Sequence, residues 1–228
     1  MALHVTKNQT TRRRMVRRAL DQTLAALLAL QMCYQLLPDD LHALLGLAMV
    51  ACAIAHLALN AKGARALGRG RMNPTRFLLA AGACASAALM IILGLSGLVL
   101  SGILPVSRGL DSVARAAHLS VSYLALLIMP FHAGFHMPFP LKRKKGARSR
   151  VAPSSILWML LACGGIYEFT ALHILDYILL RMPFVLPATV PLPIYLFEHA
   201  AVMALFALLG SLAMRAAQAV GRKSRAHA

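Results

Sequence analysis

Long apolar blocks alternate along this chain with short basic or proline-rich segments. A helix needs about 20 apolar residues to cross the roughly 30 Å hydrocarbon core of a bilayer. Six blocks are long enough, and they cover Ala19–Leu37, Leu41–Ala61, Phe77–Leu104, Val113–Met137, Ser155–Leu180 and Leu192–Ala217. The pattern predicts an all-α integral membrane protein with six transmembrane helices. Polar residues make the first span the weakest, and the third is long enough that we expect it to tilt or end early.

Basic residues fall mostly on one side of these spans. With six crossings, one side receives 21 of the 24 lysines and arginines, in the N-terminal tail, in the loops 62–76 and 142–150, and in the C-terminal tail. The opposite side keeps Arg108, Arg115 and Arg181. Cytoplasmic loops of membrane proteins carry such an excess. We therefore expect both termini in the cytoplasm, because five or seven spans would scramble this asymmetry.

Composition agrees with a membrane location. The chain is 59% hydrophobic, whereas soluble domains average nearer half. A net charge of +17 would point to nucleic acid in a soluble protein. Here the charges flank apolar blocks, so we expect the lipid bilayer as a partner and no nucleic acid. The four cysteines show no C-x-x-C spacing, which argues against a zinc ribbon and against covalent c-type haem.

Histidines inside the spans carry the functional signal, because ionisable groups in a membrane are rare and usually functional. His42 and His56 are fourteen positions apart in the second span, and His118 and His132 are fourteen positions apart in the fourth. Fourteen steps along a helix rise about 21 Å and return to within about 40° of the starting face. Both spans run in the same direction, so His42 and His118 share one depth, and His56 and His132 share another.

Two imidazoles at one depth match the axial positions of a haem iron. A zinc site needs three or four ligands close together, and no such cluster is visible in the sequence. The spacing therefore predicts two haems of b type, each with its own iron and its own histidine pair. The alternative is that these histidines make structural contacts or relay protons.

Three further residues belong to this predicted site. Gly46 and Gly97 are small, which lets either a flat macrocycle or a neighbouring helix approach closely. His136 lies four residues after His132 and competes with it as the inner ligand. The matched fourteen-residue offset favours His132, and His136 could instead meet haem propionates together with the basic loop.

These residues resemble a known family. The second span has a histidine, a glycine four residues later and a histidine fourteen residues later, the third ends L-S-G-L-V-L-S-G, and the fourth reads H-L-S-V-S-Y-L-A-L-L-I-M-P-F-H-A-G-F-H. Residues 41–137 are similar to the flavinylation-associated cytochromes, small di-haem membrane proteins related in architecture to cytochrome b. The resemblance implies haem ligation by His42, His56, His118 and His132. It also implies electron transfer between a membrane donor, such as a quinol, and an extracytoplasmic flavoprotein.

The last two spans lie outside the resemblance. Glu168 and His173 in the fifth, and Glu198 and His199 in the sixth, place carboxylates near histidines. Such groups can move protons at a quinone site. The alternative is that they pair with each other or with water near the membrane surface, and this alternative is slightly favoured.

The organisation expected is a basic cytoplasmic tail (1–18), a four-helix di-haem bundle (19–137), a basic cytoplasmic loop (138–154), two further transmembrane helices (155–217) and a cytoplasmic tail (218–228). The function expected is electron transfer across the bacterial inner (cytoplasmic) membrane, between a quinone pool and an extracytoplasmic redox partner. The chain would act alone or as the membrane subunit of an oxidoreductase. The competing classes are a proton or solute transporter with a histidine relay, and a structural anchor, which would need no histidines within its spans.

Overall fold

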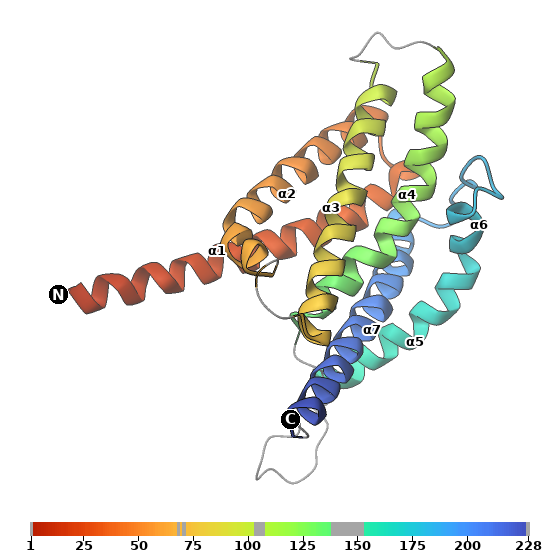
Figure 1. Ribbon diagram of the computed structural model, residues 1–228. Helices are drawn as coiled ribbons and strands as arrows, with labels where there is room; N and C mark the ends of the chain where they lie inside the picture. The colour runs from red at the N-terminus through yellow and green to blue at the C-terminus, as the bar shows by residue number, and fades with distance from the viewer. Residues whose placement is uncertain (1, 68, 70–71, 103–107, 138–152, 227–228) are drawn as a thin grey trace.

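The computed structural model describes residues 2–67, 69, 72–102, 108–137 and 153–226. Every element in these ranges is a helix (Figure 1), which confirms the all-α prediction. The elements are α1 (Ala2–Met32), the short 3-10 helix η1 (Tyr34–Leu36), α2 (Asp39–Leu67), α3 (Pro74–Leu100), α4 (Arg108–Gly134), α5 (Pro153–Ala171), α6 (Ile174–Ile178) and α7 (Leu192–Ala226). Most of the loop predicted to be basic, residues 138–152, lies outside the described residues.

Four of the described helices, α2, α3, α4 and α7, are long and apolar enough to cross a membrane. Their outer faces are rich in exposed apolar side chains, such as Leu47 at 68% and Ile54 at 65% exposure on α2, which suits contact with lipid tails. The apolar helical stretch in α5, Ile156–Ala171, is shorter. The membrane prediction is thus confirmed in its coarser form, and six crossings stay a prediction.

The helices differ from the predicted spans at several ends, and α7 continues to Ala226 through most of the predicted C-terminal tail. Helix α1 begins at Ala2, so most of the expected tail is helical, in keeping with its helix-favouring arginines. One helix through Leu180 was predicted for the fifth span. This prediction is wrong, because the helix breaks between α5 and α6. At this break His173 takes a left-handed conformation with φ 51°, which few residues other than glycine adopt. The prediction missed the break because no glycine or proline marks it.

The third span ends early, as expected. Asn73 caps the start of α3 by accepting a hydrogen bond from the Arg76 amide at 2.9 Å, and Pro74 occupies the first turn. The helix stops at Leu100, and Gly102 follows with a φ of 72° that glycine adopts readily.

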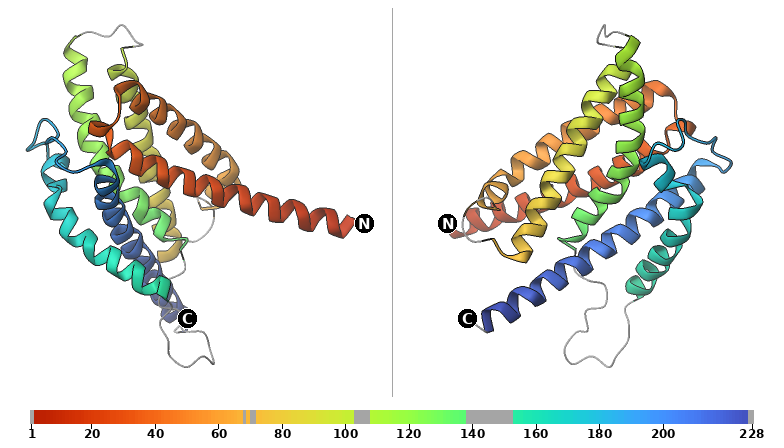
Figure 2. Two further views of the ribbon diagram at one scale, coloured as in Figure 1. Left: turned by 180° about the vertical axis from the view of Figure 1, so that it is seen from behind. Right: turned by 45° about the vertical axis from the view of Figure 1, so that its right-hand side comes forward.

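Helix α4 is central to the packing, with α3 along one side and α7 along another, while α5 covers α7 and α1 runs beside α2. Figure 2 shows the N-terminal part of α1 projecting away from the other helices. Glycines permit the closest crossing: a Cβ on Gly134 would lie 2.0 Å from the carbonyl oxygen of Ala207, and one on Gly210 would lie 1.9 Å from that of Phe131. Small residues at helix crossings are typical of membrane proteins.

The segment between α6 and α7 is fastened to the bundle by polar contacts. The Gln35 side chain donates to the Leu186 carbonyl at 2.6 Å and accepts from the Ala188 amide at 2.6 Å. The Leu186 amide donates to the Tyr177 hydroxyl at 2.9 Å. Tyr177 in turn stacks on Tyr123 of α4, with ring centroids 4.4 Å apart. These contacts hold α6 against α4.

Candidate cofactor site

His42 of α2 and His118 of α4 lie face to edge, with ring centroids 6.2 Å apart and ring planes at 74°. Their helices do not pack chiefly on one another, because α2 lies against α1 and α3, and α4 lies against α3 and α7. The structure thus brings together the outer pair that the fourteen-residue spacing predicts. The role of these rings as ligands stays a prediction.

The Nδ1 atom of His118 is held by α3. It lies 3.0 Å from the Ser96 hydroxyl oxygen. The Ser96 hydroxyl donates its own hydrogen to the carbonyl oxygens of Ile92 and Leu93, at 2.7 and 3.2 Å. The Ser96 oxygen therefore accepts from the His118 Nδ1–H. This tautomer leaves Nε2 with its lone pair, which is the form that binds a metal.

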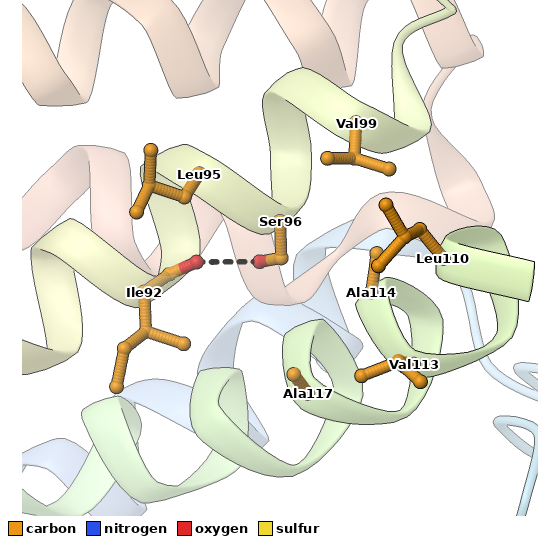
Figure 3. Close-up of a pocket in the computed structure, with 8 residues that line it drawn as sticks. All are labelled: Ile92, Leu95, Ser96, Val99, Leu110, Val113, Ala114 and Ala117. Atoms are coloured by element: carbon orange, nitrogen blue, oxygen red, sulfur yellow. Dashed lines mark hydrogen bonds between the residues drawn. The ribbon is translucent and has the colours of Figure 1, made fainter. Parts of the chain in front are cut away.

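Figure 3 shows where Ser96 sits. It lies at one side of an open groove of about 250 Å³ between α3 and α4, and its bond to Ile92 is drawn there. The other lining side chains are apolar: Ile92, Leu95, Val99, Leu110, Val113, Ala114 and Ala117. Ser96 is consequently a polar group in an apolar wall, and its hydrogen bonds serve the backbone of α3 and the ring of His118.

The Nδ1 atom of His42 is met by α1. One terminal atom of the Gln31 side-chain amide lies 2.8 Å from it. The amide orientation that satisfies its neighbours places the Gln31 nitrogen there, so that it donates to His42 Nδ1 at 2.8 Å while the Gln31 oxygen accepts from the Gly46 amide at 2.6 Å. In this arrangement His42 Nδ1 accepts, and a metal at Nε2 would require the Gln31 amide to turn so that its oxygen accepts from Nδ1–H. Gly46 makes room for the Gln31 side chain, because a Cβ there would lie 2.8 Å from one terminal atom of its amide. The neighbour of Gly46 in the structure is thus a side chain of α1.

Gly97 lies against His118. A Cβ on Gly97 would lie 3.5 Å from the His118 ring carbon Cε1, which is an ordinary contact distance. The predicted closeness of this glycine to the site is therefore present. Its absence of a side chain is not what allows the histidine to fit.

The Nδ1 atom of His56 is also met by α1. It lies 2.8 Å from the Asp21 carboxylate oxygen Oδ1. A carboxylate only accepts, so His56 donates through Nδ1 and its Nε2 is free. Asn60 donates to the His56 backbone carbonyl at 2.9 Å. A histidine oriented by a carboxylate is a common arrangement at metal centres.

His132 faces α3, as His118 does. A Cβ on Gly82 of α3 would lie 2.7 Å from His132 Nδ1, and this nitrogen is buried without a hydrogen-bond partner. The ring contacts Phe135 and His136, at centroid distances of 5.5 and 5.6 Å. Within the described part of the chain, His56 and His132 are not in ring contact, so the inner pair is more open than the outer pair.

One rule relates all four histidines. The Nδ1 atoms of the α2 histidines face α1, at Gln31 and Asp21, and those of the α4 histidines face α3, at Ser96 and Gly82. Ser96 and Gly82 are fourteen positions apart, like the histidines that they face. The predicted site did not include these four neighbours. The polar interruptions of the first span, and the repeated offset in the third, were signals that could have found them.

The second predicted site is not assembled in the same way. His173 Nδ1 lies 3.4 Å from the Asp176 carboxylate, which also accepts from Arg181 at 3.4 Å. These three residues pair with each other near one end of α6, and of the four residues predicted for this site only His173 takes part. Among the described residues, no hydrogen bond joins Glu168 or Glu198 to either His173 or His199.

His199 is fully buried in α7. Its Nδ1–H donates to the Tyr195 carbonyl at 2.9 Å, and its Nε2 has no hydrogen-bond partner. The Tyr195 ring lies 4.6 Å from it, centroid to centroid. The quinone or proton role expected for this residue stays a prediction.

Comparisons with protein-family models, with curated proteins and with solved structures find no match for this chain. In the residues described, no group of three or more histidine, cysteine, aspartate or glutamate side chains could hold a metal ion.

Proposed function

We propose that this chain is a b-type di-haem cytochrome that carries electrons across a membrane. The observation that supports it best is the orientation of the four histidines. Their Nδ1 atoms face α1 or α3, so Nε2 is the ring nitrogen that remains for iron, at His42 once the Gln31 amide turns its oxygen toward Nδ1. Histidines that ligate metals usually have the other ring nitrogen occupied by a neighbouring group.

The separation of the outer pair is compatible with one iron bound by both imidazoles. His42 and His118 would each supply one nitrogen ligand, with a metal–nitrogen bond of about 2 Å. His42 and His118 have centroids 6.2 Å apart.

At the inner level His56 and His132 are the proposed ligands. His132 lies within α4, whereas His136 is exposed and follows the helix end at Gly134. His132 also shares its fourteen-residue offset with His56. These observations favour His132 over His136, which is placed better to meet the charged groups of a cofactor near the basic loop.

Each part of the protein has a task in this proposal. Haem b supplies reversible one-electron chemistry at iron. The histidines would hold one haem at each of two depths, about 21 Å apart along the helix axes, and Gln31, Asp21 and Ser96 would orient their rings. The apolar side chains of α2, α3 and α4 exclude water, which helps to set the potential of each centre.

The remaining expectations are part of the proposal. Six crossings would place both termini in the cytoplasm of a bacterial inner membrane, with the His42–His118 level near the outer surface. Electrons would pass between a quinone pool and an extracytoplasmic flavoprotein or other redox subunit. The resemblance of residues 41–137 to the flavinylation-associated cytochromes supports a quinone on one side of this electron transfer and an extracytoplasmic flavoprotein on the other.

The test is a reduced-minus-oxidised visible spectrum of the purified full-length protein, with haem counted per chain by the pyridine haemochrome method. Two b haems per chain are expected, with about one remaining after His42→Ala or His118→Ala. His4→Ala, at a histidine in the N-terminal tail, is the matched control and should keep both. Protein that binds no haem despite an ample haem supply would overturn the proposal and make a histidine-based transporter the better hypothesis.

A further inference from the structure

We propose that Asp21 is a positioning residue that selectively lowers the reduction potential of the inner haem. The inference rests on the proposed function and goes beyond it, because it assigns α1 a role in setting the energies of the two centres. It is carried by the contact between Asp21 and His56 across α1 and α2.

The two levels differ in the charge of their Nδ1 neighbours. At the outer level both neighbours are neutral, the Gln31 amide and the Ser96 hydroxyl. At the inner level His132 Nδ1 has no hydrogen-bond partner, and His56 Nδ1 lies 2.8 Å from the Asp21 carboxylate. Asp21 is thus the one carboxylate among the described groups that contact these four Nδ1 atoms.

The acceptor decides how strongly His56 donates electrons. A carboxylate that accepts the Nδ1–H makes the imidazole more basic and orients it, and an amide or hydroxyl does so less. A more basic axial ligand stabilises the oxidised iron relative to the reduced iron. Axial ligands and the hydrogen bonds around them are among the means by which proteins set haem potentials.

The surroundings of Asp21 direct it to His56. Arg17 lies one helical turn earlier on α1, but its guanidinium donates to the Leu59 carbonyl at 2.6 Å. Among the described residues, the recorded ion-pair partner of Asp21 is His56. Asp21 belongs to the predicted first span, in which a carboxylate would be costly. A neutral amide already joins α1 to α2 at Gln31, so contact between the helices does not by itself require a charge.

The inference is tested by redox titration of the full-length protein in detergent, with absorbance followed in the haem α-band and haem counted beforehand. Asp21→Asn keeps the size of the side chain and removes its charge. The expected result is two haems per chain, with one potential shifted upward and the other unchanged. A wild-type protein without haem would reject the proposed function itself, and the haem count detects this before any titration.

Gln31→Glu is the mirror-image variant, because it puts a carboxylate beside His42 Nδ1. It should lower the potential of the other centre and leave the Asp21-dependent one unchanged. Two intact haems whose potentials do not move in Asp21→Asn, or move together, would overturn the inference while leaving the cytochrome intact. If Asp21→Asn does not retain its haem, Gln31→Glu decides: a single lowered potential supports the inference, and unchanged potentials overturn it.

Discussion

Ser96 and His118 are joined across α3 and α4 by a 3.0 Å hydrogen bond from the histidine Nδ1 to the serine oxygen. Fourteen positions earlier on α3, Gly82 faces His132, which is fourteen positions later on α4. Because α3 and α4 run antiparallel, the same offset matches at both levels. Helix α3 thus contacts both histidines of α4, through the Ser96 hydroxyl at His118 and through the backbone of Gly82 at His132.

Ser96→Ala should weaken haem binding at the outer level. The variant removes the acceptor of the His118 Nδ1–H, and loss of such a neighbour typically costs about 10–100-fold in affinity for the bound metal group. The measurement is the rate of haem transfer from the protein to an excess of an apo-haem acceptor, followed by absorbance.

Ser86→Ala is the matched control for Ser96→Ala. Ser86 is on the same helix, and its hydroxyl is buried without a hydrogen-bond partner. Its removal should leave both transfer rates unchanged. Equal rates in Ser96→Ala and the wild type would contradict an orienting role for Ser96.

Gly82→Ala should disturb the inner haem and spare the outer one. The added Cβ would lie 2.7 Å from His132 Nδ1 and 2.6 Å from Phe135 Cε2, so the His132 ring must move. Haem content should fall from two to about one per chain. In Gly94→Ala the new Cβ would lie 3.7 Å from Val50. That distance is an ordinary contact, so this control should keep both haems.

His132→Ala and His136→Ala should separate the two candidates for the inner ligand. His132 is inside α4 and faces Gly82, whereas His136 is exposed beyond the helix end. We expect His132→Ala to lose one haem and His136→Ala to retain both, as judged by haem content and by the α-band spectrum. Loss of a haem in His136→Ala, with two retained in His132→Ala, would reverse the assignment.

Gly210→Ala should lower the stability of the whole bundle. The new Cβ would lie 1.9 Å from the Phe131 carbonyl oxygen, so α4 and α7 must separate. Overpacking of this kind costs about 1–3 kcal/mol in the free energy of unfolding. The measurement is thermal unfolding in detergent, followed by circular dichroism. Gly164→Ala, whose Cβ would meet nothing within 4 Å, should unfold at or slightly above the wild-type temperature, because alanine favours a helix more than glycine does. An equal downward shift in both variants would argue against a specific effect at the crossing.

Much of the helical structure was predictable from the sequence. Apolar runs of spanning length, such as that from Leu41 to Ala61, predict helices because a backbone surrounded by lipid must satisfy its own hydrogen bonds. The two histidine levels were also predictable, because the rise and turn of a helix place His42 and His56 on roughly the same face. The break at His173 was not readable, because its positive φ occurs at a residue that gives no local signal for it.

The sequence by itself determined the helices, their apolar faces and the two histidine levels, because these depend on the local geometry of a single helix. Only the tertiary structure decided which neighbour meets each Nδ1 atom. Asp21 and His56 are 35 positions apart, and Ser96 and His118 are 22 apart. Their contact depends on how α1 and α3 rotate and slide against α2 and α4. That register is set by side-chain packing between helices, which no periodicity within one helix encodes.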